Sequence, residues 1–353
     1  MIPFGTGWRP TKIEPAHPHS PPEVPHEPAN NHANNDSHSF PTRLLLDLRR
    51  DLRFGQRVAS AHYDDASNRW TVTTRAGARH ACRYLVSASG LLSVTYQPPF
   101  RDVDAFRGQT CITGRWPKTP VDFVGKRVAV IGTGASAVQA IPIIAHDAAH
   151  LTVFQRTPNY VMPARNYVIT EAEQRALRAG FDDMVAQCHR QIFAFPMEDS
   201  TQALNDVPPE DRQRVLERGW EAGGFRFLFE TFYDLLIDRA SNEVAAEFVR
   251  RKIRAIVRDP VTAEKLCPKY PLLAKRPPLG HFYFETFNRP NVTLVDVADD
   301  PIEAITATGL KTGSREFGDF DIIVYATGFD ASTGALMHID RSEERRVGKE
   351  CLR

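Results

Sequence analysis

A short glycine-rich segment between two apolar runs constrains the fold of this chain more than any other feature. The apolar run 128–131 leads into Gly132-Thr133-Gly134-Ala135-Ser136-Ala137, residues 135–148 favour a helix, and 151–154 resemble a buried strand. A strand, a glycine turn, a helix and a second strand in this order are typical of the βαβ unit that binds dinucleotides. Gly132 permits the tight turn, Gly134 lets a pyrophosphate approach the backbone, and Ala137 lets the helix pack close to the strand. We therefore predict that residues 132–137 bind a dinucleotide, with its phosphates at the helix N-terminus.

The residues after the second strand indicate which dinucleotide is bound. An NAD site usually places a carboxylate about 20 residues beyond the glycines, where it binds the ribose hydroxyls. This chain has Gln155-Arg156-Thr157 there, a cation and a hydroxyl in place of a carboxylate. The planar guanidinium suits phosphate oxygens, so we predict that Arg156 and Thr157 bind a 2′-phosphate and that the cofactor is NADP. A surface arginine without a ligand is the alternative.

Composition excludes several other classes of protein. The net charge of +1 gives no indication of a nucleic-acid partner or an anionic membrane. The five cysteines form no CxxC pair and no zinc-binding spacing, which argues against a disulfide reductase and predicts free thiols in a reducing compartment. No apolar run approaches the roughly 18 residues that span a bilayer. We expect a cytoplasmic protein with no metal site.

The character of the sequence changes along the chain. Residues 1–41 hold nine of the 26 prolines and five of the 12 histidines, and we expect this segment to be disordered because it has too few apolar residues to offset its ordering entropy. A helical pattern follows over 42–54. Runs at 57–63, 70–74 and 83–88 resemble short strands, with a turn at Ala76-Gly77.

The second half of the chain contains a long helical region before strands return. Residues 170–260 favour helices, and one of them has Ser241 as its expected N-cap. The aromatic residues within this region are interpreted as core rather than as a substrate pocket. Strand patterns return at 292–295 and 321–325.

Several motifs of the chain resemble those of the Baeyer–Villiger monooxygenases. That family carries the pattern FxGxxxHxxxWP before its NADP-binding glycines, and Phe106, Gly108, Trp116 and Pro117 match it, whereas Ile112 stands at the histidine position. The resemblance implies that this histidine supports domain motion, so Ile112 is expected to affect turnover more than the fold. The similarity covers roughly residues 43–340 and continues through Val153-Phe154-Gln155-Arg156-Thr157-Pro158, Lys275-Arg276-Pro277-Pro278 and Ala326-Thr327-Gly328-Phe329-Asp330.

The resemblance implies an α/β flavoprotein with two Rossmann-like dinucleotide-binding domains, a helical insertion and an incomplete FAD domain. Its expected parts are a disordered Pro/His-rich segment at 1–41, a partial FAD-binding domain and linker at 42–117, an NADP-binding domain at 118–320 with the insertion at 170–260, a return to the FAD domain at 321–340, and an artefactual or disordered tail at 341–353. The NADP domain is expected to be a largely parallel sheet.

The resemblance also implies a reaction and the residues that perform it. Enzymes of this family use FAD, NADPH and O2 to insert one oxygen atom next to a ketone carbonyl, which gives an ester or lactone. Arg276 matches the family's active-site arginine, which stabilises the anion that attacks the ketone and the tetrahedral adduct. Lys275 matches the lysine that holds the 2′-phosphate together with Arg156 and Thr157. A solvated basic loop is the alternative for this pair.

One motif of the family is missing. No GxGxxG precedes Gly132, although the family seats the FAD pyrophosphate on such a turn. We interpret residues 1–41 as a frameshifted or unrelated translation, and the tail from Arg341 as the translation of a sequencing adapter, so that the chain is expected to be truncated at both ends. Two alternatives stay open: a non-catalytic NADP-binding fragment, and a flavin monooxygenase that oxidises nitrogen or sulfur. The sequence predicts neither the ketone nor the oligomeric state.

Overall fold

The structure is a computed structural model that describes residues 51–191 and 193–342. The chain divides into two units, 1–57 and 58–353, each of which is described by itself. In the first unit the described residues 51–57 hold a single 3₁₀ residue, Asp51, and a turn at Phe54-Gly55. The segment expected at 1–41, residues 343–353 of the tail expected at 341–353, and residues 42–50 of the helix expected at 42–54 lie outside the described residues.

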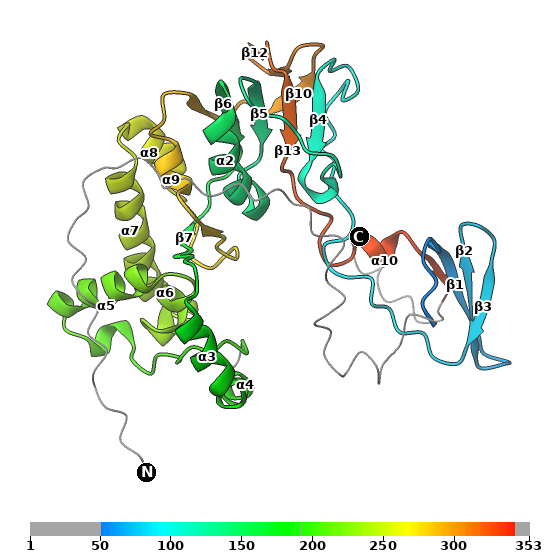
Figure 1. The fold of residues 1–353 in the computed structure, drawn as a ribbon, viewed down its shortest axis with the longest axis horizontal. Coiled ribbons are helices and arrows are strands. Elements are labelled where there is room, and N and C mark those ends of the chain that lie inside the picture. Colours follow the sequence, from blue (N-terminus) through cyan, green and yellow to red (C-terminus); the bar gives the residue numbers. More distant parts are fainter. Residues whose placement is uncertain (1–50, 192, 343–353) are drawn as a thin grey trace. The chain divides into compact units, whose positions relative to one another are not determined.

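The second unit contains a four-stranded sheet with the order β14-β1-β2-β3. Its strands are β1 (Val58–Asp64), β2 (Arg69–Thr74), β3 (Arg79–Cys82) and β14 (Asp340–Ser342) (Figure 1). The chain turns between β2 and β3 at Gly77, whose φ is 86°, as predicted for Ala76-Gly77.

One expectation for this region is wrong. The strand expected at 83–88 is absent, and β3 lies earlier in the sequence; Tyr84 and Val86 are 80% and 86% exposed, because no described strand pairs with their segment. The first two residues of the tail expected at 341–353 belong to β14, which pairs in parallel with β1 through Ser60↔Asp340 and Ala61↔Arg341, so these two are not disordered; the adapter origin of the tail stays a prediction.

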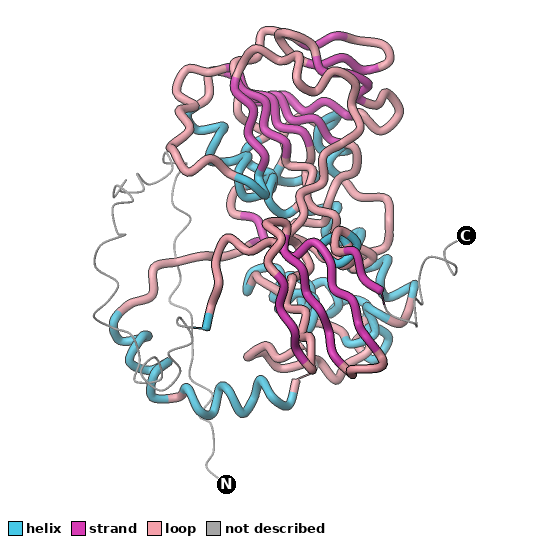
Figure 2. Tube along the Cα trace, turned by 90° about the vertical axis from the view of Figure 1, so that its right-hand side faces the viewer, coloured by secondary structure: helices cyan, strands magenta, loops and turns pink. Residues whose placement is uncertain are grey.

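A five-stranded sheet with the order β4-β13-β5-β6-β9 organises the middle of the chain. Its strands are β4 (Gln109–Ile112), β13 (Ile322–Tyr325), β5 (Arg127–Ile131), β6 (His150–Gln155) and β9 (Val292–Asp296), and every neighbouring pair is parallel. The helix α2 (Ala135–Asp147) connects β5 to β6. Figure 2 shows neighbouring strands of this sheet running side by side. The predicted parallel sheet and its βαβ unit are therefore confirmed.

Both faces of this sheet are covered, which explains why its strands are continuous apolar runs. On one face Val128 and Val130 share a core with Ile141 of α2. On the other face Ala129 and Ile131 share a core with residues of a small antiparallel sheet, formed by β10 (Ile302–Ile305), β11 (Leu310–Thr312) and β12 (Glu316–Phe317).

The limits of the sheet correct the boundaries expected for the NADP domain. The strands β4 and β13 lie outside the range 118–320, yet β13 pairs with β4 on one side and with β5 on the other. The register places Tyr325 beside both Ile112 and Ile131. The sheet thus extends over 109–325, because a strand far along the chain is inserted next to the first strand of the βαβ unit.

The region 170–260 is mainly helical, as predicted. It contains α3 (Glu171–Ala179), α4 (Phe181–Arg190), η3 (Leu204–Asp206), α5 (Pro209–Ala222), α6 (Arg226–Phe229), η4 (Tyr233–Leu236) and α7 (Arg239–Ile256). The aromatic rings of Trp220, Phe227 and Phe248 are buried and pack on one another, with Phe227 and Phe248 stacked at 5.5 Å. Ser241 is not the N-cap of α7: Asp238 is, because its carboxylate accepts from the N–H of Ser241 at 2.7 Å.

Shorter elements complete the unit. They are η2 (Thr113–Arg115), β7 (Met162–Pro163), β8 (Leu279–Gly280), α8 (Pro260–Leu266), α9 (Tyr283–Thr286) and α10 (Gly334–Met337). The strands β7 and β8 pair in parallel through Met162↔Leu279. None of the helices in the described ranges combines the length and the apolar character that a bilayer crossing requires.

Candidate functional site

The glycine turn lies between β5 and α2, as predicted, and its two glycines meet different surroundings. Gly132 has φ 110°, and a Cβ there would lie 2.5 Å from the carbonyl oxygen of Ala326, so both the backbone angle and the packing require glycine. Gly134 has φ −75° and a Cβ there would meet nothing within 4 Å. Gly132 therefore serves the fold, and Gly134 leaves space that a ligand can fill.

The first turn of α2 supplies backbone donors beside this space. The N–H of Val138 makes the first helical bond, to the carbonyl of Gly134 at 2.9 Å. The preceding N–H groups of Ala135, Ser136 and Ala137 belong to the turn that has no acceptor within its own helix. Ala137 is fully buried, whereas Gly134 and Ala135 are exposed. The exposed end of α2 thus has the free donors and positive dipole that favour an anion.

Thr133 connects this turn to the segment that leaves β6. Its side chain is nearly buried, and its hydroxyl donates to the carbonyl oxygen of Thr157 at 2.9 Å. The carbonyl oxygen of Thr133 accepts from the side-chain amide of Asn159 at 2.6 Å. The structure therefore brings the glycine turn and Thr157 together, while the hydroxyl of Thr157 itself makes no hydrogen bond within the described residues.

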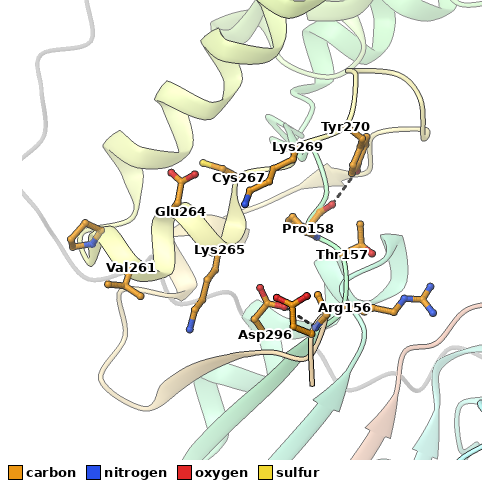
Figure 3. Close-up of a pocket in the computed structure, with 13 residues that line it drawn as sticks. Arg156, Thr157, Pro158, Val261, Glu264, Lys265, Cys267, Lys269, Tyr270 and Asp296 are labelled. Carbon is orange, nitrogen blue, oxygen red and sulfur yellow. Dashed lines mark hydrogen bonds between the residues drawn. The ribbon is translucent and has the colours of Figure 1, made fainter. Parts of the chain in front are cut away.

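A cavity of about 890 Å³ lies at the carboxyl ends of β6 and β9 (Figure 3). Arg156 and Thr157 line it, as do cationic and acidic side chains from other segments: Lys265, Lys269, Glu264, Asp296 and Asp299. Figure 3 shows the Arg156 side chain extending away from Lys265. Carboxyl ends of parallel strands are the usual ligand-binding edge of such a sheet.

Sequence reasoning missed the lysines and carboxylates of this cavity. Asp296 is the last residue of β9, and its position after the next parallel strand is a signal that could have found it. Lys265 comes from α8, which Gln155 fixes to the sheet by donating from Nε2 to the carbonyl of Lys265 at 2.7 Å.

Cys267 also lines the cavity, and burial raises the pKa of its thiol. It is therefore a protonated thiol at neutral pH.

Lys275 and Arg276 occupy different surroundings, although they are neighbours. The ammonium of Lys275 lies 5.0 Å from the ring centroid of Tyr270, which lines the cavity. Arg276 is exposed, makes no hydrogen bond or ion pair with the described residues, and lines neither this cavity nor a second one of about 360 Å³ around Trp220 and Tyr283. Lys275 thus lies beside Tyr270, a residue of the wall of the cavity that Arg156 and Thr157 line, whereas Arg276 has no such contact.

The motif around residues 106–117 has packing roles. Phe106 belongs to the core on the far side of the sheet from α2. A Cβ on Gly108 would lie 2.6 Å from the Phe106 ring, so the glycine lets that ring pack against the backbone. Trp116 is 42% exposed, and its ring centroid lies 6.3 Å from that of Phe123. Ile112 ends β4 opposite Tyr325.

The described residues hold no group of three or more histidine, cysteine or acidic side chains that could bind a metal. The four cysteines among them, Cys82, Cys111, Cys188 and Cys267, are free.

Comparison with curated proteins gives a consistent group of relatives. The chain is 43% identical over 296 residues to a Baeyer-Villiger monooxygenase of Pseudooceanicola batsensis, covering 84% of this chain and 54% of the relative. It is 41% identical over 295 residues to cyclohexanone 1,2-monooxygenase of an Acinetobacter species, covering 83% and 54%. No family model matches the chain.

Solved structures agree with these relatives. The crystal structure of OTEMO in complex with FAD and NADP has a TM-score of 0.84 and 39% identity, covering 88% of this chain and 58% of that one. The open crystal structure of cyclohexanone monooxygenase has a TM-score of 0.81 and 40% identity, covering 86% and 59%. The fold is therefore that of part of a two-dinucleotide-domain flavoprotein, because the chain covers 58% and 59% of these two structures. The chain spans about half the length of the curated relatives it matches, and over that span it is similar to Baeyer–Villiger monooxygenases.

Proposed function

We propose that the chain binds NADP(H) across the carboxyl ends of β5 and β6. The observation that carries this proposal is the open space at Gly134, which adjoins the exposed N-terminus of α2 and connects through Thr133 to Thr157. The pyrophosphate lies on the N–H groups of Ala135, Ser136 and Ala137. The adenosine lies toward the cavity lined by Arg156 and Thr157.

In this proposal the 2′-phosphate is held by Arg156, Thr157 and Lys275. Arg156 is exposed, and the hydroxyl of Thr157 makes no hydrogen bond to other described residues, so both groups can turn to a phosphate. Lys275 adds a second cation from the opposite segment, next to the Tyr270 ring at the cavity wall. When it is bound, NADPH supplies the reducing equivalents of the reaction.

We extend the proposal to flavin-dependent Baeyer–Villiger oxygenation, in which one oxygen atom of O2 is inserted next to a ketone carbonyl at the expense of NADPH. Relatives named as cyclohexanone and cyclopentanone monooxygenases, at 41% and 38% identity, support this reaction class. Arg276 is the proposed catalytic residue, because it is an exposed cation that no described residue neutralises. The protein is proposed to work in the cytoplasm with a small ketone and O2.

The described residues offer one strand–glycine turn–helix unit, and NADP occupies it in this proposal. They show no second such unit for the FAD pyrophosphate. A non-catalytic NADP-binding role of this chain is therefore the second candidate function. A relative named phenazine N-monooxygenase, at 40% identity, makes an aromatic nitrogen heterocycle a substrate to test beside the ketones.

Replacement of Arg156 or Lys275 by alanine tests the cofactor proposal. We expect each change to weaken NADPH binding about tenfold or more, because each removes a charge-assisted contact to the 2′-phosphate, and to leave NADH binding unchanged. Titration of NADPH and NADH against the quenching of protein fluorescence measures both. Arg175→Ala on α3 removes an exposed arginine that lines neither cavity, and serves as the charge-matched control. Unchanged NADPH binding in both variants would contradict the proposed clamp.

Addition of FAD to the full chain separates the two candidate functions. Oxygenation requires that the chain retain a yellow flavin after desalting and consume NADPH in proportion to added ketone. Under those conditions Arg276→Ala should lower the ketone-dependent rate about 10²–10³-fold, while NADPH binding stays intact. A chain that binds NADPH but retains no flavin supports the non-catalytic role.

A further inference from the structure

The side chain of Tyr270 connects the glycine turn to a distant segment. Its hydroxyl lies 2.9 Å from Oδ1 of Asn159 and 3.1 Å from the carbonyl oxygen of Pro158, two acceptors for its proton. Asn159 in turn donates from Nδ2 to the carbonyl oxygen of Thr133. Two hydrogen bonds thus join residue 270 to the middle of the glycine turn.

The ring of Tyr270 has a second contact. The ammonium of Lys275 lies 5.0 Å from its centroid, within the range of a cation–π interaction. Lys275 is exposed and has no ion pair with the described residues. The ring therefore restricts a flexible side chain that would otherwise sample many rotamers, and it does so without neutralising the charge.

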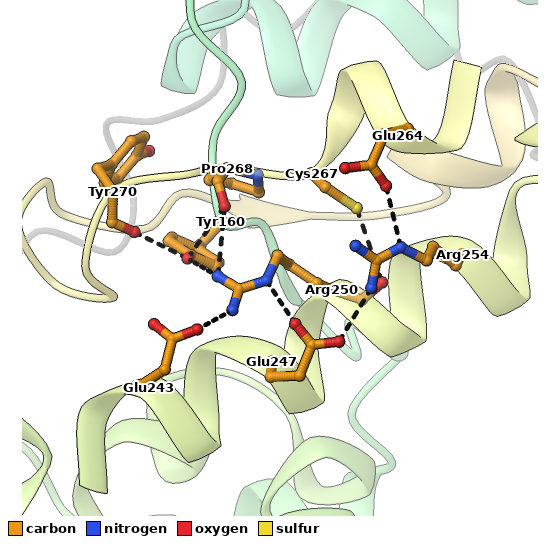
Figure 4. Close-up of polar contacts among 9 residues, drawn as sticks. All are labelled: Tyr160, Glu243, Glu247, Arg250, Arg254, Glu264, Cys267, Pro268 and Tyr270. Carbon is orange, nitrogen blue, oxygen red and sulfur yellow. Dashed lines mark hydrogen bonds and ion pairs between the residues drawn. The ribbon is translucent and has the colours of Figure 1, made fainter. Parts of the chain in front are cut away.

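The backbone of Tyr270 is held from α7 (Figure 4). Its carbonyl oxygen accepts from the hydroxyl of Tyr160 at 2.8 Å, and the two rings meet edge to face at 5.4 Å. The guanidinium of Arg250 donates to the hydroxyl of Tyr160 at 3.0 Å and contacts the carbonyl oxygen of Pro268 at 3.4 Å. Residues 268–270 are thereby fixed on the helical region.

Arg250 is itself held in place. Its guanidinium pairs with Glu243 and with Glu247, the latter at 2.7 Å, and its side chain is only 12% exposed. Tyr270 consequently has a fixed backbone, a hydroxyl directed at the glycine turn and a ring beneath Lys275. Burial raises the pKa of Tyr270 to about 12, so its hydroxyl keeps its proton at physiological pH.

We propose that Tyr270 is a positioning residue for NADP recognition and that its two halves act on different parts of the cofactor. The hydroxyl, through Asn159, sets the glycine turn that receives the phosphate next to the ribose. The ring sets the ammonium of Lys275 for the 2′-phosphate. This inference rests on the proposed NADP site and adds a residue that does not touch the reacting atoms.

Two small ligands separate the two halves. Both 2′,5′-ADP and 5′-AMP carry the 5′-phosphate, and only the first carries the 2′-phosphate. The dissociation constant of 5′-AMP divided by that of 2′,5′-ADP, measured by calorimetric titration of the full chain, reports the 2′-phosphate contacts alone. The affinity for 5′-AMP reports the glycine turn.

Tyr270→Phe removes only the hydroxyl and keeps the ring. We expect it to weaken the binding of both ligands by a similar factor, about two- to tenfold, because the glycine turn loses a supporting hydrogen bond. The ratio of the two dissociation constants should stay unchanged, because the aromatic ring next to Lys275 is still present. Asn159→Ala should reproduce this result. Unchanged affinity for both ligands in both variants would overturn the role of the hydroxyl.

The role of the ring is tested in two ways: by withdrawing electron density from it and by removing it. Replacement of Tyr270 by 4-cyanophenylalanine keeps the ring shape of the Phe variant but withdraws electron density, and should lower the ratio about two- to fivefold relative to Tyr270→Phe. Tyr270→Met should lower this ratio of dissociation constants by a similar factor. Neither change should alter the ratio when Lys275 is also replaced by alanine. If Tyr270→Met fails to fold, the cyano variant still decides.

The outcomes distinguish this inference from the proposed NADP site. A parent chain that binds 2′,5′-ADP no better than 5′-AMP contradicts the NADP proposal itself. A parent chain with a clear preference that survives intact in the cyano and Met variants, even if their melting temperatures fall, overturns the role of the ring and with it the proposal that the two halves of Tyr270 act on different parts of the cofactor.

Discussion

Gly132→Ala is expected to destabilise the chain severely, whereas Gly134→Ala should leave its stability nearly unchanged. At Gly132 a side chain meets both a φ of 110° and the carbonyl oxygen of Ala326, a backbone atom that cannot move away without disturbing the end of β13. The strained backbone and the overpacking each cost about 1–3 kcal/mol, so the melting temperature should fall by roughly 10 °C. Thermal melting followed by circular dichroism measures the change.

Gly134→Ala should affect the ligand instead of the fold. Its φ of −75° suits any residue, and its Cβ points into open space. We expect a melting temperature within about 2 °C of the parent and NADPH binding weakened at least tenfold, because the added methyl occupies the path of the pyrophosphate. Normal NADPH binding by this variant would show that the dinucleotide lies elsewhere.

A third glycine separates the two causes of instability at Gly132. Gly125 has a φ of 68°, and a Cβ there would meet nothing within 4 Å. Gly125→Ala should therefore cost only the strain of the left-handed backbone, about 1–2 kcal/mol. If it destabilises the chain as much as Gly132→Ala does, the contact with Ala326 has no energetic weight.

The βαβ unit could be predicted from sequence because its signals are local. The apolar strand, the glycines at 132 and 134 and the helix that follows all lie between residues 127 and 147, and the structure has each of them in the expected place. The position of β13 between β4 and β5 could not be predicted in this way. Its pairing joins residues about 200 positions apart, such as Ile323 with Ala129 and Thr110, and no local pattern specifies the partner.

The same distinction holds for the candidate site. Arg156 and Thr157 follow a recognisable strand, so their proximity to the glycine turn was predictable. Asn159 and Tyr270 were not identified, because their contact spans 111 positions and each residue alone is an ordinary polar or aromatic side chain. The incorrect prediction of a strand at 83–88 has a related cause, because an apolar run becomes a strand only where a partner strand is present.

Arg250→Ala is the second change with a large expected effect. The guanidinium joins Glu243, Glu247, the hydroxyl of Tyr160 and the carbonyl of Pro268, and its side chain is 12% exposed. Its removal leaves the Tyr160 hydroxyl with fewer partners and deletes buried packing. We expect a loss of about 2–3 kcal/mol in the free energy of unfolding, below the full cost of a buried ion pair because the two carboxylates are largely exposed.

Arg254→Ala is the matched control for this change. Arg254 lies one helical turn further along α7 and also pairs with Glu247, at 3.0 Å, and with Glu264, at 3.1 Å. Its side chain is 40% exposed, so solvent screens both pairs and the expected loss is about 0–1 kcal/mol. Urea unfolding of the two variants beside the parent gives the comparison. Equal losses would show that the number of ion pairs decides stability here, and that the burial of Arg250 does not.

The pH dependence of the Arg250→Ala effect follows from Glu247. Burial works to raise the pKa of Glu247, but the hydrogen bonds and charges of Arg250 and Arg254 together outweigh it and hold the pKa below the ordinary value of 4.5. A carboxylate with a lowered pKa stabilises the folded state above its unfolded pKa, and this contribution is lost as the pH falls through the folded value. The stability difference between the parent and Arg250→Ala should therefore be constant above about pH 5.5 and shrink below pH 4.5. A difference that stays constant down to pH 3 would assign the effect of Arg250 to its packing and to Tyr160, with no part for its pairing with Glu247.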